Sequence, residues 1–214
     1  MNRLQPYQIK QLIFGGEGVC VDFKKTITSC EKIAKTMVSF ANNKGGRLLI
    51  GVADDKNIKG VKNEDEEKYM IERAASLFAK PMLEPVFEEI YIDDKLVLVV
   101  NINESDIKPH YAFGEDKRWW VYVRVKDKSI LASKLVVDVL HQANSISTGV
   151  LITYTENEKT LFNYLEVNQK ITLKEFAILL KKSRRYAGKI LVPLILSGVI
   201  KVHTELNEEY YLAV

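Results

Sequence analysis

The sequence has few of the residues that stabilise secreted scaffolds or anchor a chain in a membrane. Only two of its 214 residues are cysteines, Cys20 and Cys30, which excludes a disulfide framework and a four-cysteine zinc site. No apolar run approaches the ~18 residues of a membrane-spanning helix. Residues 1–10 lack the apolar segment of a secretory signal. We therefore expect a cytoplasmic protein with no membrane partner.

A strong excess of charge is also missing. The chain has 31 basic and 28 acidic residues, and its net charge of +3 is too small to indicate a nucleic-acid partner by itself. There is no GxxxxGK[ST] loop, which argues against a standard ATPase. The three histidines are too far apart in sequence for metal-ligand spacing. We expect no cofactor in the leading interpretation, and any charged binding surface has to be local.

Apolar spacing predicts an α+β fold with two domains. Over residues 1–144, helices alternate with strands joined both ways, which is typical of a two-layer α/β domain. The predicted helices cover residues 5–14, a segment capped by Thr28 and Glu31 that ends before Gly45-Gly46, 64–79 and 133–143. The predicted strands cover residues 19–23, 47–52, 86–92, 96–102 and 119–125.

The pattern changes after a polar segment, which we predict to be a linker over residues 145–154. Over residues 155–214, capping boxes at Thr155/Glu158 and Thr172/Glu175 open two helices, and Ser183 can cap a third that runs to about residue 196. Pro193 is expected to kink or shorten the third helix. Two strands follow, over 199–203 and 210–214. This order predicts a winged helix-turn-helix module.

Basic residues gather at the start of the third helix of this module. No acidic residue occurs between Phe176 and Thr204. In such modules this helix enters the major groove of DNA, where arginine contacts guanine edges or phosphates. The predicted nucleic-acid-binding residues are Lys181, Lys182, Arg184, Arg185 and Lys189.

Two observations keep another interpretation open. A basic run on a helix is often only a solvated surface, in which case the module serves for dimerisation. The predicted wing is acidic at its tip, with Glu205, Glu208 and Glu209, and should repel phosphate. If DNA binds, we expect the helix to contact it and the wing to stay away.

Carboxylates in the first domain raise a second possibility. Glu17 and Asp22 flank the first strand, and Asp54 and Asp55 follow the second, so three of them could hold Mg²⁺ or Mn²⁺ for phosphodiester hydrolysis. Glu17 and Asp22 would point to opposite faces of one strand, so they converge only if Glu17 lies in the loop before it. The alternative is that Asp54 and Asp55 are turn residues and Asp22 is an edge polar residue.

Three segments carry a family resemblance. The strings GGEGVCVDFKK and KIAKTMVSFANNKGGRLLIGVADD, with Gly60-Val61 after them, resemble the Schlafen-type AlbA domain, whose pattern runs G-E-x-x-x-x-E-F-K, then S-A-F-A-N-x-x-G-G, then I-G-V. Segments at Lys108–Tyr111, Tyr122–Val125 and Ala132-Ser133 resemble its later parts. The resemblance implies a fold similar to that of Alba chromatin proteins, and a bacterial DNA-binding domain often followed by a winged helix in transcriptional regulators.

Some Schlafens imply a different activity, because they are metal-dependent RNases that use two glutamates of the E-x-x-x-x-E block and a later aspartate. Glu17 matches the first glutamate, and Lys24 matches the lysine of E-F-K. Asp22 stands where the family has the second glutamate, and the later aspartate corresponds to Asp54 or Asp55. In this alternative Glu17, Asp22, Lys24 and Asp54 are catalytic, with Glu17, Asp22 and Asp54 as ligands of Mg²⁺ or Mn²⁺.

The leading hypothesis is a non-enzymatic DNA-binding transcriptional regulator, with RNA as an alternative partner and a homodimer as a compatible state. The Schlafen-type nuclease is the second hypothesis. The third is a protein-interaction module that binds no nucleic acid.

Overall fold

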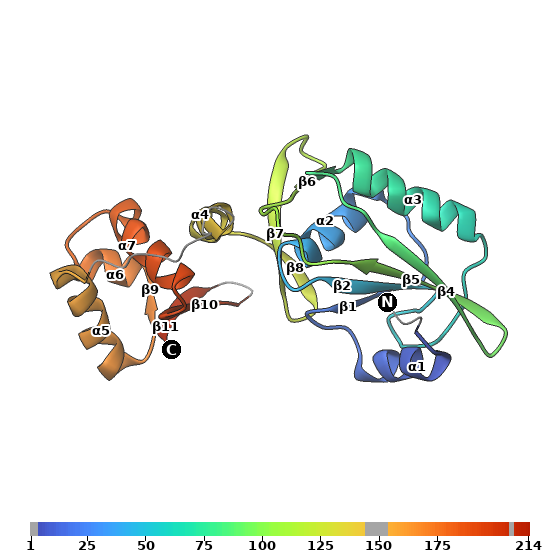
Figure 1. Ribbon diagram of the computed structural model, residues 1–214, viewed down its shortest axis with the longest axis horizontal. Helices are drawn as coiled ribbons and strands as arrows, with labels where there is room; N and C mark the ends of the chain where they lie inside the picture. Colours follow the sequence, from blue (N-terminus) through green and yellow to red (C-terminus); the bar gives the residue numbers. More distant parts are fainter. Residues whose placement is uncertain (1–3, 144–153, 206–207) are drawn as a thin grey trace. The chain divides into compact units, whose positions relative to one another are not determined.

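The computed structural model describes residues 4–143, 154–205 and 208–214. The chain divides into two compact units, Met1–Ala132 and Ser133–Val214 (Figure 1). The mixed α/β fold class that the sequence predicts is confirmed. None of the helices in these described ranges is long and apolar enough to cross a membrane.

The first unit is organised around a four-stranded sheet with the order β1-β2-β5-β4. β1 and β2 are parallel, whereas β5 runs antiparallel to both β2 and β4. Side chains alternate along these strands, so Leu48 and Val100 belong to one core and Leu49 and Val99 to another. The strands are β1 (Val21–Lys24), β2 (Gly46–Ile50), β4 (Val86–Ile92) and β5 (Lys95–Ile102).

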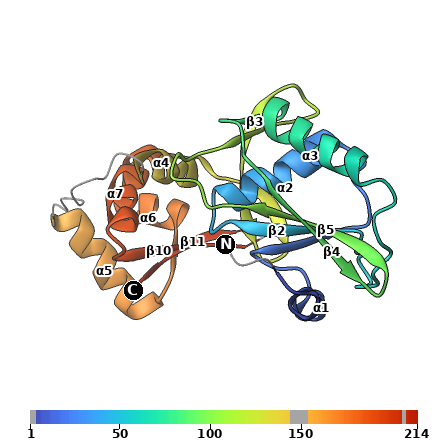
Figure 2. The ribbon, with the colours of Figure 1, turned by 45° about the vertical axis from the view of Figure 1, so that its right-hand side comes forward.

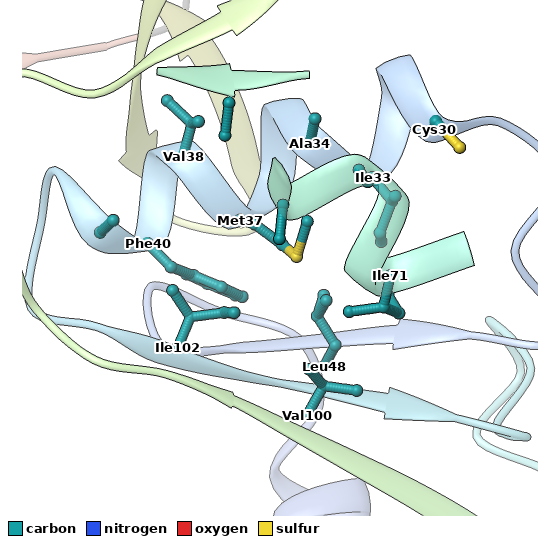
Figure 3. Packing of buried hydrophobic residues seen from close by; sticks show 14 of the residues in the cluster. Cys30, Ile33, Ala34, Met37, Val38, Phe40, Leu48, Ile71, Val100 and Ile102 are labelled. Carbon is teal, nitrogen blue, oxygen red and sulfur yellow. The ribbon is translucent and has the colours of Figure 1, made fainter. Parts of the chain in front are cut away.

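Helices cover both faces of this sheet. α2 (Cys30–Ala41) and α3 (Glu64–Leu77) lie on one face, and α1 (Pro6–Gly15) lies on the other (Figures 1 and 2). Figure 3 shows Met37 and Phe40 of α2 above Leu48 and Ile102 of the sheet. These side chains are almost entirely buried, so α2 is the centre of the larger core.

A second sheet packs on α2, mainly through β6 and β7. Its order is β3-β6-β7-β8. Its strands are β3 (Ala79–Lys80), β6 (Tyr111–Phe113), β7 (Trp119–Val125) and β8 (Lys128–Leu131). α2 therefore lies between two sheets, which explains why most of its residues are buried, Thr36 and Ser39 among them.

Gly45 and Gly46 make a tight entry from α2 into β2. Gly45 has φ +72°, and a Cβ there would lie 2.7 Å from the carbonyl oxygen of Ile102. A Cβ at Gly46 would lie 2.5 Å from the ring of Phe40. Both positions therefore require glycine for packing.

Within its described residues, the second unit has four helices and a three-stranded sheet with the order β10-β11-β9. Its core contains Leu161, Phe176, Leu191 and Tyr211, all almost inaccessible to solvent. After α4, the elements follow in the order helix, short strand, helix, helix and two strands; that this unit is a winged helix stays a prediction. The elements are α4 (Lys134–Ala143), α5 (Glu156–Asn168), β9 (Ile171–Thr172), α6 (Leu173–Leu179), α7 (Arg184–Leu196), β10 (Ile200–Thr204) and β11 (Glu209–Ala213).

α4 belongs to the second unit, and not to the first domain of residues 1–144 that the sequence predicts. The physical reason is packing: Leu135 of α4 is buried in the core of the second unit, and Val139 packs against it. The predicted linker over residues 145–154 lies outside the described residues except at Tyr154.

Local capping signals place most helix starts correctly. The boxes at Thr155/Glu158 and Thr172/Glu175 are both formed, and the Ser183 side chain accepts a hydrogen bond from the amide of Tyr186. α2 begins one residue later than predicted, because Ser29 is its N-cap. Pro193 does not shorten α7, which continues to Leu196.

Candidate functional site

The predicted basic cluster lies in the turn between α6 and α7 and in the first turns of α7. Lys181 occupies the left-handed region with φ +53°, which reverses the chain between the two helices. Ser183 then caps α7. Arg184, Arg185 and Lys189 are exposed. The structure thus brings the five predicted residues together on one short segment.

The electrostatics of this helix start are unusual. The N-terminus of a helix carries a partial positive charge, so acidic side chains stabilise it and basic ones weaken it by about 0.3–1 kcal/mol each. The first turn of α7 has no acidic residue and begins with Arg184 and Arg185. Neither arginine forms an ion pair within the part of the chain that the structure describes. Their charges and the helix dipole therefore add, which favours an anion at this position.

Tyr186 lies beside the cluster and links α7 to α5. Its hydroxyl accepts a hydrogen bond of 3.4 Å from Nδ2 of Asn157, and Nζ of Lys182 lies 5.9 Å from its ring centroid. The ring is partly exposed. Tyr186 thus joins the basic segment to α5 through these two contacts.

A groove of about 700 Å³ runs between α4 and α7. Its walls combine apolar side chains, such as Leu135 and Val192, with charged ones. Sequence reasoning missed this groove, because α4 was assigned to the other domain. The charged residues that line it are Lys134 and Asp138 of α4 and Arg184, Arg185 and Lys189 of α7.

The glutamates of the predicted acidic wing lie where β10 ends and β11 begins. Glu205 lies 3.7 Å from Nε2 of His203 and accepts a hydrogen bond of 3.3 Å from the hydroxyl of Tyr210. Glu208 is exposed, whereas Glu209 accepts a hydrogen bond from the hydroxyl of Tyr211. The charge of these three glutamates is therefore opposite to that of the start of α7.

The predicted carboxylates Glu17 and Asp22 meet at the start of β1. Glu17 lies in the loop before the strand, as convergence requires, and its Oε1 accepts a hydrogen bond of 2.8 Å from the amide of Phe23. Nζ of Lys24 lies 2.5 Å from Asp22 and 4.0 Å from Glu17. These three residues are brought together.

Arg124 of β7 forms an ion pair with Oδ1 of Asp22, the carboxylate oxygen that Lys24 does not contact. Its Nη2 atom lies 2.8 Å from Oδ1 of Asp22, and the Arg124 side chain is only 2% exposed. Arg124 also donates hydrogen bonds to the carbonyl oxygens of Gly18 and Val21. Two cations therefore neutralise Glu17 and Asp22, and a divalent metal would have to displace them. The sequence offers no local signal for this role, since Arg124 is distant along the chain.

Asp54 does not join this cluster. It lies exposed in the turn after β2, next to Asp55, which accepts hydrogen bonds from Asn57. Hydrogen bonds from the Asn57 side chain and backbone lower the pKa of Asp55. Among the residues with described positions, no group of three or more His, Cys, Asp or Glu side chains could hold a metal ion. The residues present do not fit a metal centre.

Comparisons with solved structures give two similar chains. One is the N-terminal domain of an ATP-dependent DNA helicase RecG-related protein from Nitrosomonas europaea, with 20% identity, a TM-score of 0.44, and coverage of 52% of this chain and 82% of that chain. The other is the DIP2311 protein from Corynebacterium diphtheriae, with 14% identity, a TM-score of 0.46, and coverage of 76% of this chain and 39% of that chain. No curated protein matches the chain.

The family model described as Schlafen, AlbA_2 matches residues 17–133. The match spans more than half of the chain and includes β1 with Asp22, α2, both sheets and β7 with Arg124. The first unit of this chain therefore confirms the resemblance seen in its sequence, and the chain belongs to the Schlafen AlbA_2 family.

Proposed function

We propose that this protein binds double-stranded DNA through α7 and acts as a transcriptional regulator. The observation that carries the proposal is the pair Arg184 and Arg185, exposed, without ion-pair partners among the described residues, and adjacent to a capped helix start. Phosphate oxygens suit such a position, because the free backbone N–H groups of a helix start and arginine side chains both bind anions.

The surroundings of α7 support this function. The chain carries no acidic residue from Phe176 to Thr204, so the basic segment has no local neutralising partner in sequence. α6 and α7 follow each other after a short turn at Lys181, in the order of a helix-turn-helix. Membership of the Schlafen AlbA_2 family agrees with a nucleic-acid partner for the first unit as well.

An affinity titration tests the proposal. Full-length protein is titrated onto a fluorescently labelled duplex, and its anisotropy is compared with that of the double variant Arg184→Ala/Arg185→Ala. Loss of two charge-assisted contacts should weaken binding by about tenfold or more. Unchanged affinity would show that the start of α7 is not part of the DNA-binding surface.

A matched control separates the position of the charges from their number. Lys159→Ala/Lys170→Ala also removes two positive charges, but from exposed positions on α5 and just after it. We expect this variant to bind within about twofold of the wild type. Equal weakening in both variants would indicate only a non-specific charge effect.

The acidic wing favours a second candidate, a protein-interaction module. Its carboxylates would repel a DNA backbone that approached β10 and β11, but they would accept a basic partner. In that case neither double variant changes duplex binding, because the wild type binds no duplex at any salt concentration.

A further inference from the structure

α4 contacts α7 within the second unit (Figure 2). Leu135 is 5% exposed, and its Cδ1 atom lies 3.5 Å from the position that a Cβ at Gly188 would occupy. Val139, one turn further along α4, packs against the same core. The contact between the two helices is therefore an apolar one, centred on the middle of α7.

This contact lies beside the face of α7 that would read DNA. Ala187, Leu191 and Leu194 are buried and point into the core of the unit. Arg185 and Lys189 lie about half a helical turn away from those residues, on the outward side. Both line the groove that α4 forms with α7, as does Asp138 of α4.

The dimensions decide whether α7 can bind DNA with α4 in place. The major groove is about 12 Å wide, and one helix with its side chains is about 10–12 Å across. Two packed helices have axes about 8–10 Å apart, so together they span roughly 20 Å. α6 also packs on α7, but through the buried side of the helix. α4 lies on the side where Arg184, Arg185 and Lys189 line the shared groove, so α7 enters the major groove with that side foremost only after α4 has moved.

We propose that α4 is an intramolecular cover of α7 that holds the protein in a state of low DNA affinity. The inference rests on the proposed function and adds its regulation. α4 lines the groove that it shares with Arg184, Arg185 and Lys189, where a DNA phosphate would otherwise approach. Asp138 of α4 also lines it, paired with Lys134 of the same helix at 3.3 Å. The apparent affinity for DNA is then reduced by the small fraction of molecules in which α4 has left α7.

A pair of matched variants of the full-length chain tests the cover. Leu135→Ser/Val139→Ser removes the two α4 side chains that pack on the core of the unit. The control Val136→Ser/Leu140→Ser makes the same chemical changes, four residues apart on the same helix, at half-buried positions outside that core. The first variant should bind duplex about ten- to a hundredfold more tightly than the wild type, whereas the control should match the wild type. Equal affinity in all three proteins overturns the cover.

A crosslink keeps the test decisive if the first variant does not fold. Leu135→Cys and Gly188→Cys are introduced with Cys20→Ser, since Cys20 is exposed and Cys30 is buried. A short bifunctional thiosulfonate joins α4 to α7, and a reductant releases it. Crosslinked protein should lose duplex binding, and reduction should restore it. Binding that persists after complete crosslinking overturns the cover.

The outcomes separate this inference from the function on which it rests. If Arg184→Ala/Arg185→Ala loses binding while the α4 variants and the crosslink change nothing, α7 binds DNA and α4 is not its cover. If the wild type, the Leu135→Ser/Val139→Ser variant and the double-cysteine variant after reduction all fail to bind duplex, both the proposed function and the cover are wrong.

Discussion

Replacing Arg124 with methionine should strongly destabilise the first unit. The substitution keeps the length of the side chain but removes the cation that faces Asp22, whose side chain is 6% exposed. It also removes hydrogen-bond donors from the carbonyl oxygens of Gly18 and Val21. Removing one partner of a buried ion pair costs about 3–5 kcal/mol, because the other charge stays buried. Lys24 remains beside Asp22, so we expect the lower half of that range.

Urea unfolding followed by tryptophan fluorescence measures this cost. Both tryptophans of the chain, Trp119 and Trp120, lie in β7, so the signal reports on the first unit alone. With a urea slope of about 2 kcal/mol/M, a loss of about 3–4 kcal/mol lowers the unfolding midpoint by roughly 1.5–2 M. Lys24→Met is the control, since Lys24 is 38% exposed and its ion pair should contribute less than about 1 kcal/mol.

A double-mutant cycle then isolates the pair. In the Arg124→Met variant, the buried charge of Asp22 keeps only Lys24 as a cationic partner. Asp22→Asn removes that charge, so the losses of unfolding free energy from the two substitutions should not add. The reasoning is refuted if Arg124→Met and Lys24→Met lower the midpoint equally. It is also refuted if the effects of Arg124→Met and Asp22→Asn are fully additive.

Three further predictions follow from other residues of the first unit. Asn42 donates to the carbonyl oxygens of His110 and Tyr122 and accepts from the amide of His110, so Asn42→Ala should cost about 3 kcal/mol or more in the same unfolding assay. Burial lowers the pKa of His110 from its ordinary value of 6.5, with a smaller contribution in the same direction from Lys108, while a hydrogen bond to the carbonyl of Pro81 opposes it. The unfolded chain therefore binds more protons below pH 6.5, and the stability of the unit should fall as the pH drops from about 7 through that value; in His110→Gln the dependence on pH should be weaker. Purified protein with Mg²⁺ or Mn²⁺ should not cleave structured RNA or single-stranded DNA, and Asp22→Glu should not create activity; cleavage that depends on metal and disappears in Glu17→Ala/Asp22→Ala would establish the nuclease instead.

Helix starts with a local chemical signal were predictable from the sequence. A hydroxyl at the cap and a glutamate three residues later bind each other's backbone amides, so the signal and the structure occupy the same four residues at Thr155 and Thr172. At α2 two adjacent hydroxyls compete. Ser29, and not Thr28, is the N-cap of α2, and its hydroxyl also donates a hydrogen bond to Glu31.

Features that depend on distant contacts were not predictable in the same way. β3 and β9 have two residues each, too short for an alternating pattern. α4 has one broad apolar side, and its sequence does not show which core that side joins. Arg124 acts only because the fold brings β7 beside β1, where it meets Asp22.

The dependence of DNA affinity on salt tests the central claim most directly. Each phosphate that a basic side chain contacts contributes about 0.9 to the slope of log K against log salt concentration. If Arg184 and Arg185 both contact phosphates, the slope for Arg184→Ala/Arg185→Ala should be smaller than that of the wild type by about 2. The Lys159→Ala/Lys170→Ala control should keep the wild-type slope. Identical slopes for all three proteins would contradict the assignment of α7 as the DNA-binding helix.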